Sequence, residues 1–385
     1  MERTLFEPEH DLFRESYRKF LEQEVAPFHE QWEKDKIVDR EVWKKAGAQG
    51  FLGMAVPEEY GGGGVDDFRY NVVLTEETTR GGYSGVGFML HNDVVAPYLL
   101  NLANEEQKQR WLPGFCSGEI ITAIAMTEPG TGSDLANIAT TAKLSEDGSH
   151  YIINGAKTFI TGGATADLIL TVCRTSPFDP ENRRGGLSII AVPTANEGFS
   201  VGRKLKKLGL HQQDTAELSY SDVKVPVENL LGEEGKGFSY LTHNLPQERL
   251  SIALNQVGFA EAAIAHAIAY TSDRKVFGKP VAAFQNTKFV LAECSAETQM
   301  ARVYVDHCLE LLDRKELTVA DAARAKLVCT EVAGRVIDKC LQLHGGYGYI
   351  TEYPIARLYA DTRVTRIYGG TSKVMKTIIS KDLGL

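Results

Sequence analysis

The chain has 385 residues, of which 43% are hydrophobic and 24% are charged, and its formal net charge at pH 7 is -9. This length exceeds the needs of one small core, so we expect two or three packed subdomains, and the average composition argues against a disordered chain. The acidic balance, spread along the chain, disfavours duplex DNA as a partner.

The cysteines and the start of the chain indicate a reduced, cytoplasmic protein. The six cysteines lie far apart, with neither a CxxC pair nor histidines at zinc-ligand spacing, so we expect free structural thiols and no metal site. The first eleven residues carry four acidic side chains, unlike a basic secretory or organellar presequence. No apolar run reaches transmembrane length, so we expect no membrane insertion.

The first third of the chain is predicted to be helical. From Pro8 to Phe28, apolar residues recur at three- and four-residue steps between charges, which is the pattern of an amphipathic helix. A glycine-rich turn is expected at 57–64, and helices resume over 70–79 and 105–112. These elements make up an expected N-terminal helical domain, residues 1–119.

Short β-rich runs follow and indicate a sheet. Branched apolar residues dominate the runs 120–125, 151–153, 157–160, 168–173, 187–192 and 216–225. Asn154-Gly155, between the second and third runs, is typical of a tight hairpin turn. Because no helix of useful length separates the runs, we expect an antiparallel sheet in a middle domain, residues 120–231.

Long helical periods return in the last third of the chain, over 238–272, 284–312, 319–343 and 373–380. Four helices of this kind indicate a four-helix bundle, residues 232–385. The expected fold class is therefore α+β, mostly α, in the order helical domain, antiparallel β domain, helical bundle. A doubly wound sheet is disfavoured because no GxGxxG follows a strand.

The segment 125–134, AMTEPGTGSD, places glycines beside small hydroxyl residues directly after a predicted strand. Backbone N–H groups in such a segment can approach a planar ring or a phosphate, and the alternative is an ordinary tight turn. Together with four further segments it resembles the acyl-CoA dehydrogenase family, in family order and over essentially the whole chain. Those segments are NGAKTFIT at 154–161, RKVFGK at 274–279, QLHGGYGY at 342–349 and IYGGT at 367–371.

The resemblance implies an acyl-CoA dehydrogenase fold and a bound FAD. Arg274 and Gln285 flank a loop between two predicted helices, where a guanidinium suits a pyrophosphate, and the alternative is a solvated arginine. Ser133 is expected near the CoA moiety as well. The implied flavin-binding residues are Ile124, Met126, Thr127, Gly132, Ser133, Phe159, Ile160, Thr161, Arg274, Gln285, Gln342, Leu343, His344, Gly345, Gly346, Thr371, Ser372 and Lys373.

An oligomer follows from the same resemblance. In the family, an arginine at this position and the QLHGG segment of a neighbouring subunit share one FAD, so we expect a homotetramer built as a dimer of dimers. Gly345, Gly346 and Gly348 also suit a helix end for purely structural reasons. The family passes its electrons to electron-transfer flavoprotein, and direct use of O2 is the alternative.

The catalytic base departs from the common family pattern. Many members carry a glutamate between the tyrosine and the glycine of the C-terminal loop, where this chain has Gly369. Glu248, in LPQERL at 245–250, resembles the base of the long-chain and isovaleryl subgroups. The amino-acid sequence of this segment is closest to the long-chain type. The structural alternative is a first-turn glutamate that favours the helix dipole after Pro246.

The chemistry needs few groups. Removing an α-proton from a thioester requires hydrogen-bond donors at the carbonyl oxygen, where enolate charge develops. The resemblance assigns this role to Gly369 N–H with the ribityl 2′-hydroxyl of FAD, while Glu248 takes the proton and the β-hydrogen leaves as hydride. Substrate burial is expected to raise the pKa of Glu248. The expected substrate-binding residues are Ser133, Gln247, Arg249 and Gly370, with a salt bridge within the bundle as the alternative for Arg249.

The expected function is α,β-dehydrogenation of a medium- to long-chain fatty acyl-CoA to the trans-2-enoyl-CoA in fatty acid β-oxidation. The alternatives are a branched-chain or isoprenoid acyl-CoA dehydrogenase, a non-catalytic flavoprotein that binds CoA esters, and a nucleic-acid-binding relative, which the acidic balance disfavours. Side chains around Met89–Tyr98 are expected to set the pocket depth, and Ser239 replaces a tyrosine of the long-chain relatives. His91 and His344 are expected to be structural.

Overall fold

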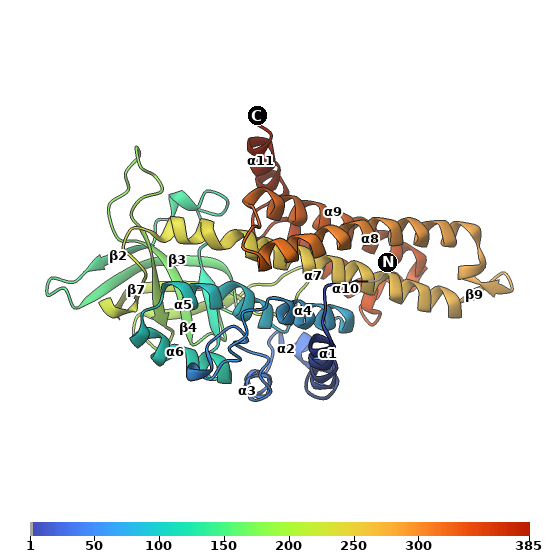
Figure 1. The fold of residues 1–385 in the computed structure, drawn as a ribbon, viewed down its shortest axis with the longest axis horizontal. Coiled ribbons are helices and arrows are strands. Elements are labelled where there is room, and N and C mark those ends of the chain that lie inside the picture. The colour runs from blue at the N-terminus through green and yellow to red at the C-terminus, as the bar shows by residue number, and fades with distance from the viewer. Residues whose placement is uncertain (1–2) are drawn as a thin grey trace.

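The structure is a computed structural model that describes residues 3–385; Met1 and Glu2, part of the acidic start, lie outside the described residues. The sheet occupies one end of the long axis and the longest helices extend to the other, with the N-terminal helices alongside both (Figure 1). These N-terminal helices are α1 (Pro8–Phe20), α2 (His29–Asp35), α3 (Arg40–Ala48), α4 (Arg69–Gly81), α5 (Ala96–Leu102) and α6 (Glu105–Ser117).

The N-terminal helices form where the apolar periodicity predicts them, but the first is interrupted. The stretch from Pro8 to Phe28 is split, because α1 continues into a π-helical turn, η1 (Leu21–Val25), before α2. Helix α6 begins with a capping box in which Asn104 and Gln107 each bond the other's backbone N–H. A second π-helical turn, η3 (Leu90–Val95), runs directly into α5.

The middle of the chain forms one sheet whose strand order is β6-β7-β3-β2-β4-β5-β8, with β1 paired to β4. Most neighbouring strands in this sheet are antiparallel, as predicted. Strands β1 and β2 each run parallel to β4, so the expected antiparallel arrangement is wrong for these two pairs. The strands are β1 (Thr122–Ala125), β2 (Thr141–Leu144), β3 (His150–Thr161), β4 (Leu168–Arg174), β5 (Leu187–Pro193), β6 (Phe199–Lys204), β7 (Thr215–Pro226) and β8 (Leu230–Leu231).

The predicted hairpin at Asn154-Gly155 is wrong. Strand β3 runs through both residues, with a β-bulge against β7 at this point. The Asn154 amide donates to Asp222 Oδ1 at 2.8 Å, and Asp222 N–H donates back to Asn154 Oδ1 at 2.9 Å, so the asparagine joins two strands instead of turning the chain. Strand β3 thereby carries its last residues to the end of β1.

The C-terminal helices are α7 (Gly237–Asp273), α8 (Gln285–Asp313), α9 (Val319–Leu343), α10 (Pro354–Thr362) and α11 (Ser372–Asp382). The predicted long helices are confirmed; α10 and the small hairpin β9 (Lys275–Val276) with β10 (Lys279–Pro280) were not predicted. Buried alanines on α7 and α9 let these helices pack closely in the bundle core. Because no element crosses 119/120 or 231/232, we propose domains 1–119, 120–231 and 232–385.

The protein core bears on two further expectations, about membrane-spanning segments and about the cysteines. Contrary to the expectation about apolar runs, α7 is long and apolar enough to span a membrane, yet 61% of that apolar window is buried inside the protein. Helix α7 is therefore the core helix of the bundle. All six cysteines are free and buried, as expected for structural thiols.

Candidate active site

Glu248 lies inside α7 and is buried, with 8% of its surface exposed. The helix begins at Gly237 rather than at Pro246, so the alternative of a first-turn glutamate stabilised by the helix dipole is wrong. The carboxylate accepts one hydrogen bond, from Tyr98 Oη at 3.2 Å. Burial raises the pKa of Glu248 to about 7, although Tyr98 and the charge of Arg249 oppose that rise. A carboxyl group with this pKa can exchange protons near neutral pH.

A two-glycine loop lies against the turn of α7 that follows Glu248. Gly369 and Gly370 have φ of +63° and +95°, the left-handed region that glycine favours. Arg249 Nε donates to the Gly369 carbonyl at 3.3 Å, and a Cβ built on Gly369 would lie 2.4 Å from Ile252 Cδ1. The position has no room for a longer side chain without movement of Ile252. Within the described residues, Gly369 N–H donates no backbone hydrogen bond.

Lys326 supports the same loop and was not found from the sequence. Its ammonium group is fully buried on α9 and donates to the Gly370 carbonyl. Burial and the nearby charge of Arg249 lower the pKa of Lys326 to about 8. The only sequence signal was a single lysine on the apolar, alanine-rich face of α9. Two buried cations thus hold the two consecutive carbonyl groups of this loop.

The first two motifs meet at the end of β1. Thr158 N–H donates to the Thr127 carbonyl at 2.9 Å, which joins segment 124–133 to the end of β3. Beneath them, the buried Lys157 ammonium group lies 2.8 Å from Glu128 Oε1 and also donates to the Val172 carbonyl. Glu128 accepts from two backbone N–H groups as well. Glu128 and Lys157 lie in two of the family-like motifs, although neither was predicted to have a role. Their buried ion pair fixes the loop that contains Gly132 and Ser133.

The surface above this ion pair fits a flat ligand. Phe159 is 67% exposed and holds a φ of +59°, which is uncommon for a residue with a side chain. Ile124, Met126 and Thr127 are half-buried beside it, and Gly132 and Ser133 are exposed. Ile160 is buried in the sheet core, so its side chain does not reach this surface. An exposed aromatic ring beside free glycine backbone fits the isoalloxazine ring of FAD.

Thr371, Ser372 and Lys373 directly follow the Gly369-Gly370 loop, whereas the remaining predicted cofactor residues lie at the opposite end of the molecule. Arg274, Leu343, His344, Gly345 and Gly346 line one hollow beyond the end of α7. Exposed Gln285 begins α8, and Gln342 is exposed near the end of α9. Helix α7 has 37 residues, so it extends roughly 55 Å from the sheet to this hollow, at 1.5 Å per residue. The residues around this hollow are therefore separated from the predicted flavin residues at the sheet by the length of α7.

Several other predicted residues have intramolecular partners. Gln247 donates to the Asp93 carbonyl at 2.8 Å, which ties α7 to η3. Within residues 3–385 Arg249 forms no salt bridge, so the alternative of a bundle salt bridge is wrong; its buried side chain donates to the Gly369 carbonyl. Thr371 caps α11, Ser372 donates to Glu331, and Lys373 is exposed.

Both histidines near the motifs are packed. His91 lies between the Phe115 carbonyl and the Thr122 hydroxyl, and burial lowers its pKa to about 3. His344 bonds the Cys340 carbonyl and stacks on Tyr270. No group of metal-ligating side chains occurs among residues 3–385.

Three domain models of one protein family match nearly the whole chain. Residues 7–119, 123–223 and 235–384 match the N-terminal, middle and C-terminal domains of acyl-CoA dehydrogenase. The mitochondrial long-chain specific acyl-CoA dehydrogenase of Sus scrofa is 46% identical over 381 residues, covering 99% of this chain and 88% of that protein.

Solved structures of acyl-CoA dehydrogenases have the same fold as this chain. The acyl-CoA dehydrogenase of Geobacillus kaustophilus matches with a TM-score of 0.97 and 49% identity, covering all of both chains. The acyl-CoA dehydrogenase of Bacillus anthracis complexed with FAD matches with a TM-score of 0.91 and 30% identity, covering all of this chain and 69% of that one. Fold and relatives thus define a flavin-dependent oxidoreductase. The chain belongs to the acyl-CoA dehydrogenase family.

Proposed function

We propose that the protein oxidises a saturated medium- to long-chain fatty acyl-CoA to its trans-2-enoyl-CoA in fatty acid β-oxidation, with Glu248 as the base. The observation that carries this proposal is the buried carboxyl group of Glu248, with a pKa of about 7, one helical turn before Ile252, which packs against Gly369. The position where many family members carry their base is a glycine here, so the only buried carboxyl group beside the loop, among the described residues, takes that role.

The loop supplies the second requirement of the chemistry. Arg249 and Lys326 hold the carbonyls of Gly369 and Gly370, and Gly369 N–H has no backbone partner in the part of the chain that the structure describes. We infer that this N–H donates to the thioester oxygen, where enolate charge develops while Glu248 takes the α-proton. FAD, when bound, supplies the acceptor for the β-hydrogen, which leaves as hydride. Gly370 lies beside the thioester in this proposal.

The two cofactor clusters support a shared FAD. We infer that residues 124–133, 159–161 and 371–373 hold the flavin half, and that Arg274, Gln285 and residues 342–346 of a second copy hold the other half. One chain cannot do both, because the length of α7 separates the clusters. Such pairs would assemble into a homotetramer. We further propose electron-transfer flavoprotein as the acceptor, and a cytoplasmic location without membrane insertion or nucleic-acid binding.

The visible spectrum of the flavoprotein tests this function. Anaerobic addition of palmitoyl-CoA should bleach the oxidised flavin band, and isovaleryl-CoA should do so far less. Bleaching by isovaleryl-CoA alone would move the assignment to the branched-chain subgroup. Glu248→Gln should keep its yellow colour and lose roughly 10²- to 10⁴-fold in the reduction rate. If no acyl-CoA reduces the wild-type flavin, the protein is a non-catalytic flavoprotein and the proposal fails.

A further inference from the structure

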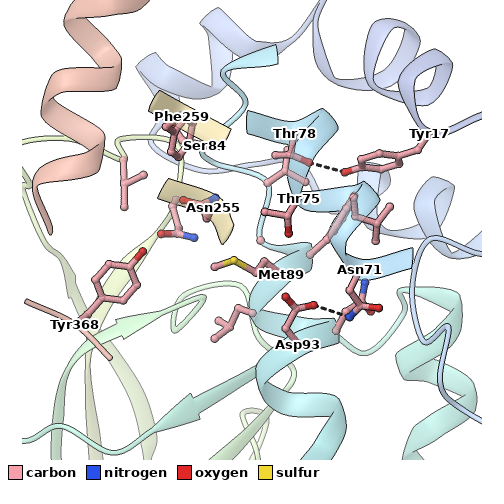
Figure 2. A pocket seen from close by; sticks show the side chains of 18 residues that line it. Tyr17, Asn71, Thr75, Thr78, Ser84, Met89, Asp93, Asn255, Phe259 and Tyr368 are labelled. Atoms are coloured by element: carbon pink, nitrogen blue, oxygen red, sulfur yellow. Dashed lines mark hydrogen bonds between the residues drawn. The ribbon is translucent and has the colours of Figure 1, made fainter. Parts of the chain in front are cut away.

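A narrow cavity lies where the three family domains meet. Ser84, which follows α4, lines it together with Asn255 of α7 and Tyr368 of the C-terminal loop (Figure 2). Leu210, in the loop between β6 and β7, also lines it. Within the described residues, the middle domain reaches the cavity only through this loop, which makes the position of the loop important for the shape of the cavity.

The cavity lies in line with the proposed base. Asn255 and Phe259 follow Glu248 at spacings of seven and eleven residues, which places them on the same face of α7. Tyr368, which also lines the cavity, directly precedes Gly369. A thioester held at Gly369 would thus direct the distal part of its acyl chain along α7 and into the cavity.

Ser84 marks the distal end of this path. Gly258 of α7 packs against Thr79 at the end of α4, because a Cβ built on Gly258 would lie 2.3 Å from the Thr79 hydroxyl oxygen. Ser84 follows Thr79 by five residues. Gly258 is roughly 15 Å beyond Glu248 along the helix, at 1.5 Å per residue. At about 1.2 Å per bond, an extended acyl chain needs roughly twelve carbons to span that length.

Asp361 on α10 joins Ser84 to Leu210. Its side chain is buried; Oδ2 accepts from the Ser84 hydroxyl at 2.5 Å, and Oδ1 accepts from the Leu210 N–H at 2.5 Å. The neighbouring Gly209 packs directly on α10, where a Cβ would lie 2.5 Å from the carbonyl carbon of Ala360. One carboxyl group of the C-terminal domain therefore fixes the cavity walls that the other two domains contribute.

Leu210 has a backbone conformation that needs such support. Its φ is +52°, in the left-handed region that residues with a side chain seldom adopt. A strained residue of this kind keeps its conformation where its surroundings hold it, and the bond from its N–H to Asp361 does so here. Resting on the proposed function, we propose that Asp361 is a positioning residue, which holds Leu210 in the distal wall of the acyl cavity and so sets the preference for long chains.

The test measures kcat/KM for flavin reduction with even-numbered acyl-CoAs from hexanoyl- to palmitoyl-CoA. Asp361→Ala and Leu210→Ala should each lose about tenfold with palmitoyl-CoA through a higher KM, the factor for two fewer buried methylene groups, and should match the wild type with hexanoyl-CoA. Equal losses at every length overturn the inference, because a general structural defect would not distinguish chain lengths. Absence of reduction of the wild type by every acyl-CoA would instead defeat the proposed function.

Two further variants tie the effect to the contact between Asp361 and Leu210. If Asp361 acts through Leu210, the double variant should lose no more with palmitoyl-CoA than either single variant, whereas independent roles would multiply to about a hundredfold. Asp361→Asn keeps an acceptor for the Leu210 N–H and can donate to the Ser84 hydroxyl, so it should retain the wild-type profile. Multiplied losses, or an asparagine variant as poor as the alanine variant, overturn the assignment.

Asp67→Ala is the matched control, because the Asp67 carboxylate bonds His10 and Arg69 and does not line the cavity. It should keep the wild-type preference for palmitoyl-CoA, and a loss as large as that of Asp361→Ala overturns the proposal. If Asp361→Ala gives no flavoprotein, Gly209→Ala replaces it, since its methyl group would press on α10 and lift the same loop. An unchanged profile in that variant contradicts the proposal. Should neither variant fold, the profile of Leu210→Ala decides alone.

Discussion

Tyr98 donates its phenolic hydrogen to Glu248 Oε1 at 3.2 Å, from α5 across to α7. This is the single hydrogen bond to the Glu248 carboxylate within the described residues, and it opposes the rise in pKa that burial causes. The phenol itself is buried beside a carboxylate, which raises the pKa of Tyr98 well above its ordinary value. Tyr98 therefore stays protonated, and able to donate, throughout the neutral pH range.

The rate of flavin reduction should rise with pH and level off above about 7, because the base must be deprotonated before it accepts a proton. Tyr98→Phe removes a hydrogen bond that favours the charged carboxylate, so the midpoint should move to higher pH. Stopped-flow measurement of the second-order rate constant for reduction by palmitoyl-CoA, across pH 5 to 9, reports this pKa of the free enzyme. A midpoint that stays in place or moves down would contradict the proposed pairing.

Stability should respond to pH in the opposite direction. The folded pKa of Glu248, about 7, lies above its ordinary value of 4.5, so the contribution of this group is complete below about pH 4 and is lost as pH rises to 7. At 1.36 kcal/mol per pKa unit, the loss is roughly 3 kcal/mol. Urea unfolding at pH 5 and pH 7 should show about 2 kcal/mol of this fall relative to Glu248→Gln, because part of the loss lies outside that interval. Parallel pH profiles for the two proteins would rule it out.

Gly369→Ala should lower the free energy of unfolding. A residue with a side chain costs about 1 to 2 kcal/mol at a left-handed φ, and the new methyl group would also press on Ile252 Cδ1. Ile252→Val in the same chain should recover only the crowding part. Gly61→Ala is the matched control, because Gly61 also has a positive φ but open space around it. Equal losses for the two alanine variants would show that the contact with Ile252 does not matter.

Lys326→Met should slow flavin reduction without unfolding the protein. The substitution removes a buried cation, which is favourable, but it leaves the Gly370 carbonyl without its donor and loosens the loop. We expect a rate roughly ten- to a hundredfold lower, an unchanged Tm and normal flavin colour. Lys339→Met, on the same helix but in exposed ion pairs with Glu293 and Glu297, should leave the rate unchanged. An unaffected rate in Lys326→Met would refute the positioning role.

Much of this architecture was predictable from residue patterns, because long apolar periods produce helices and branched runs produce strands. Strand β6 was not predicted because five of its six residues are exposed. Helix α10 was not predicted because its nine residues are too few to show a clear apolar period. Glu248 and Gly369 were paired only through the family resemblance, since 121 positions separate them. Tyr98 and Lys326 join the site through tertiary packing, which no local pattern reports.

The placement of Glu248 near one end of α7 and Arg274 directly after the other has a genetic consequence under the proposed sharing of FAD. We expect a chain with Glu248→Gln and a chain with Arg274→Ala each to be inactive alone. When both are made in one cell, a mixed pair contains one site built from the intact Glu248 of one chain and the intact Arg274 of the other. Two null alleles should therefore complement each other within a single gene.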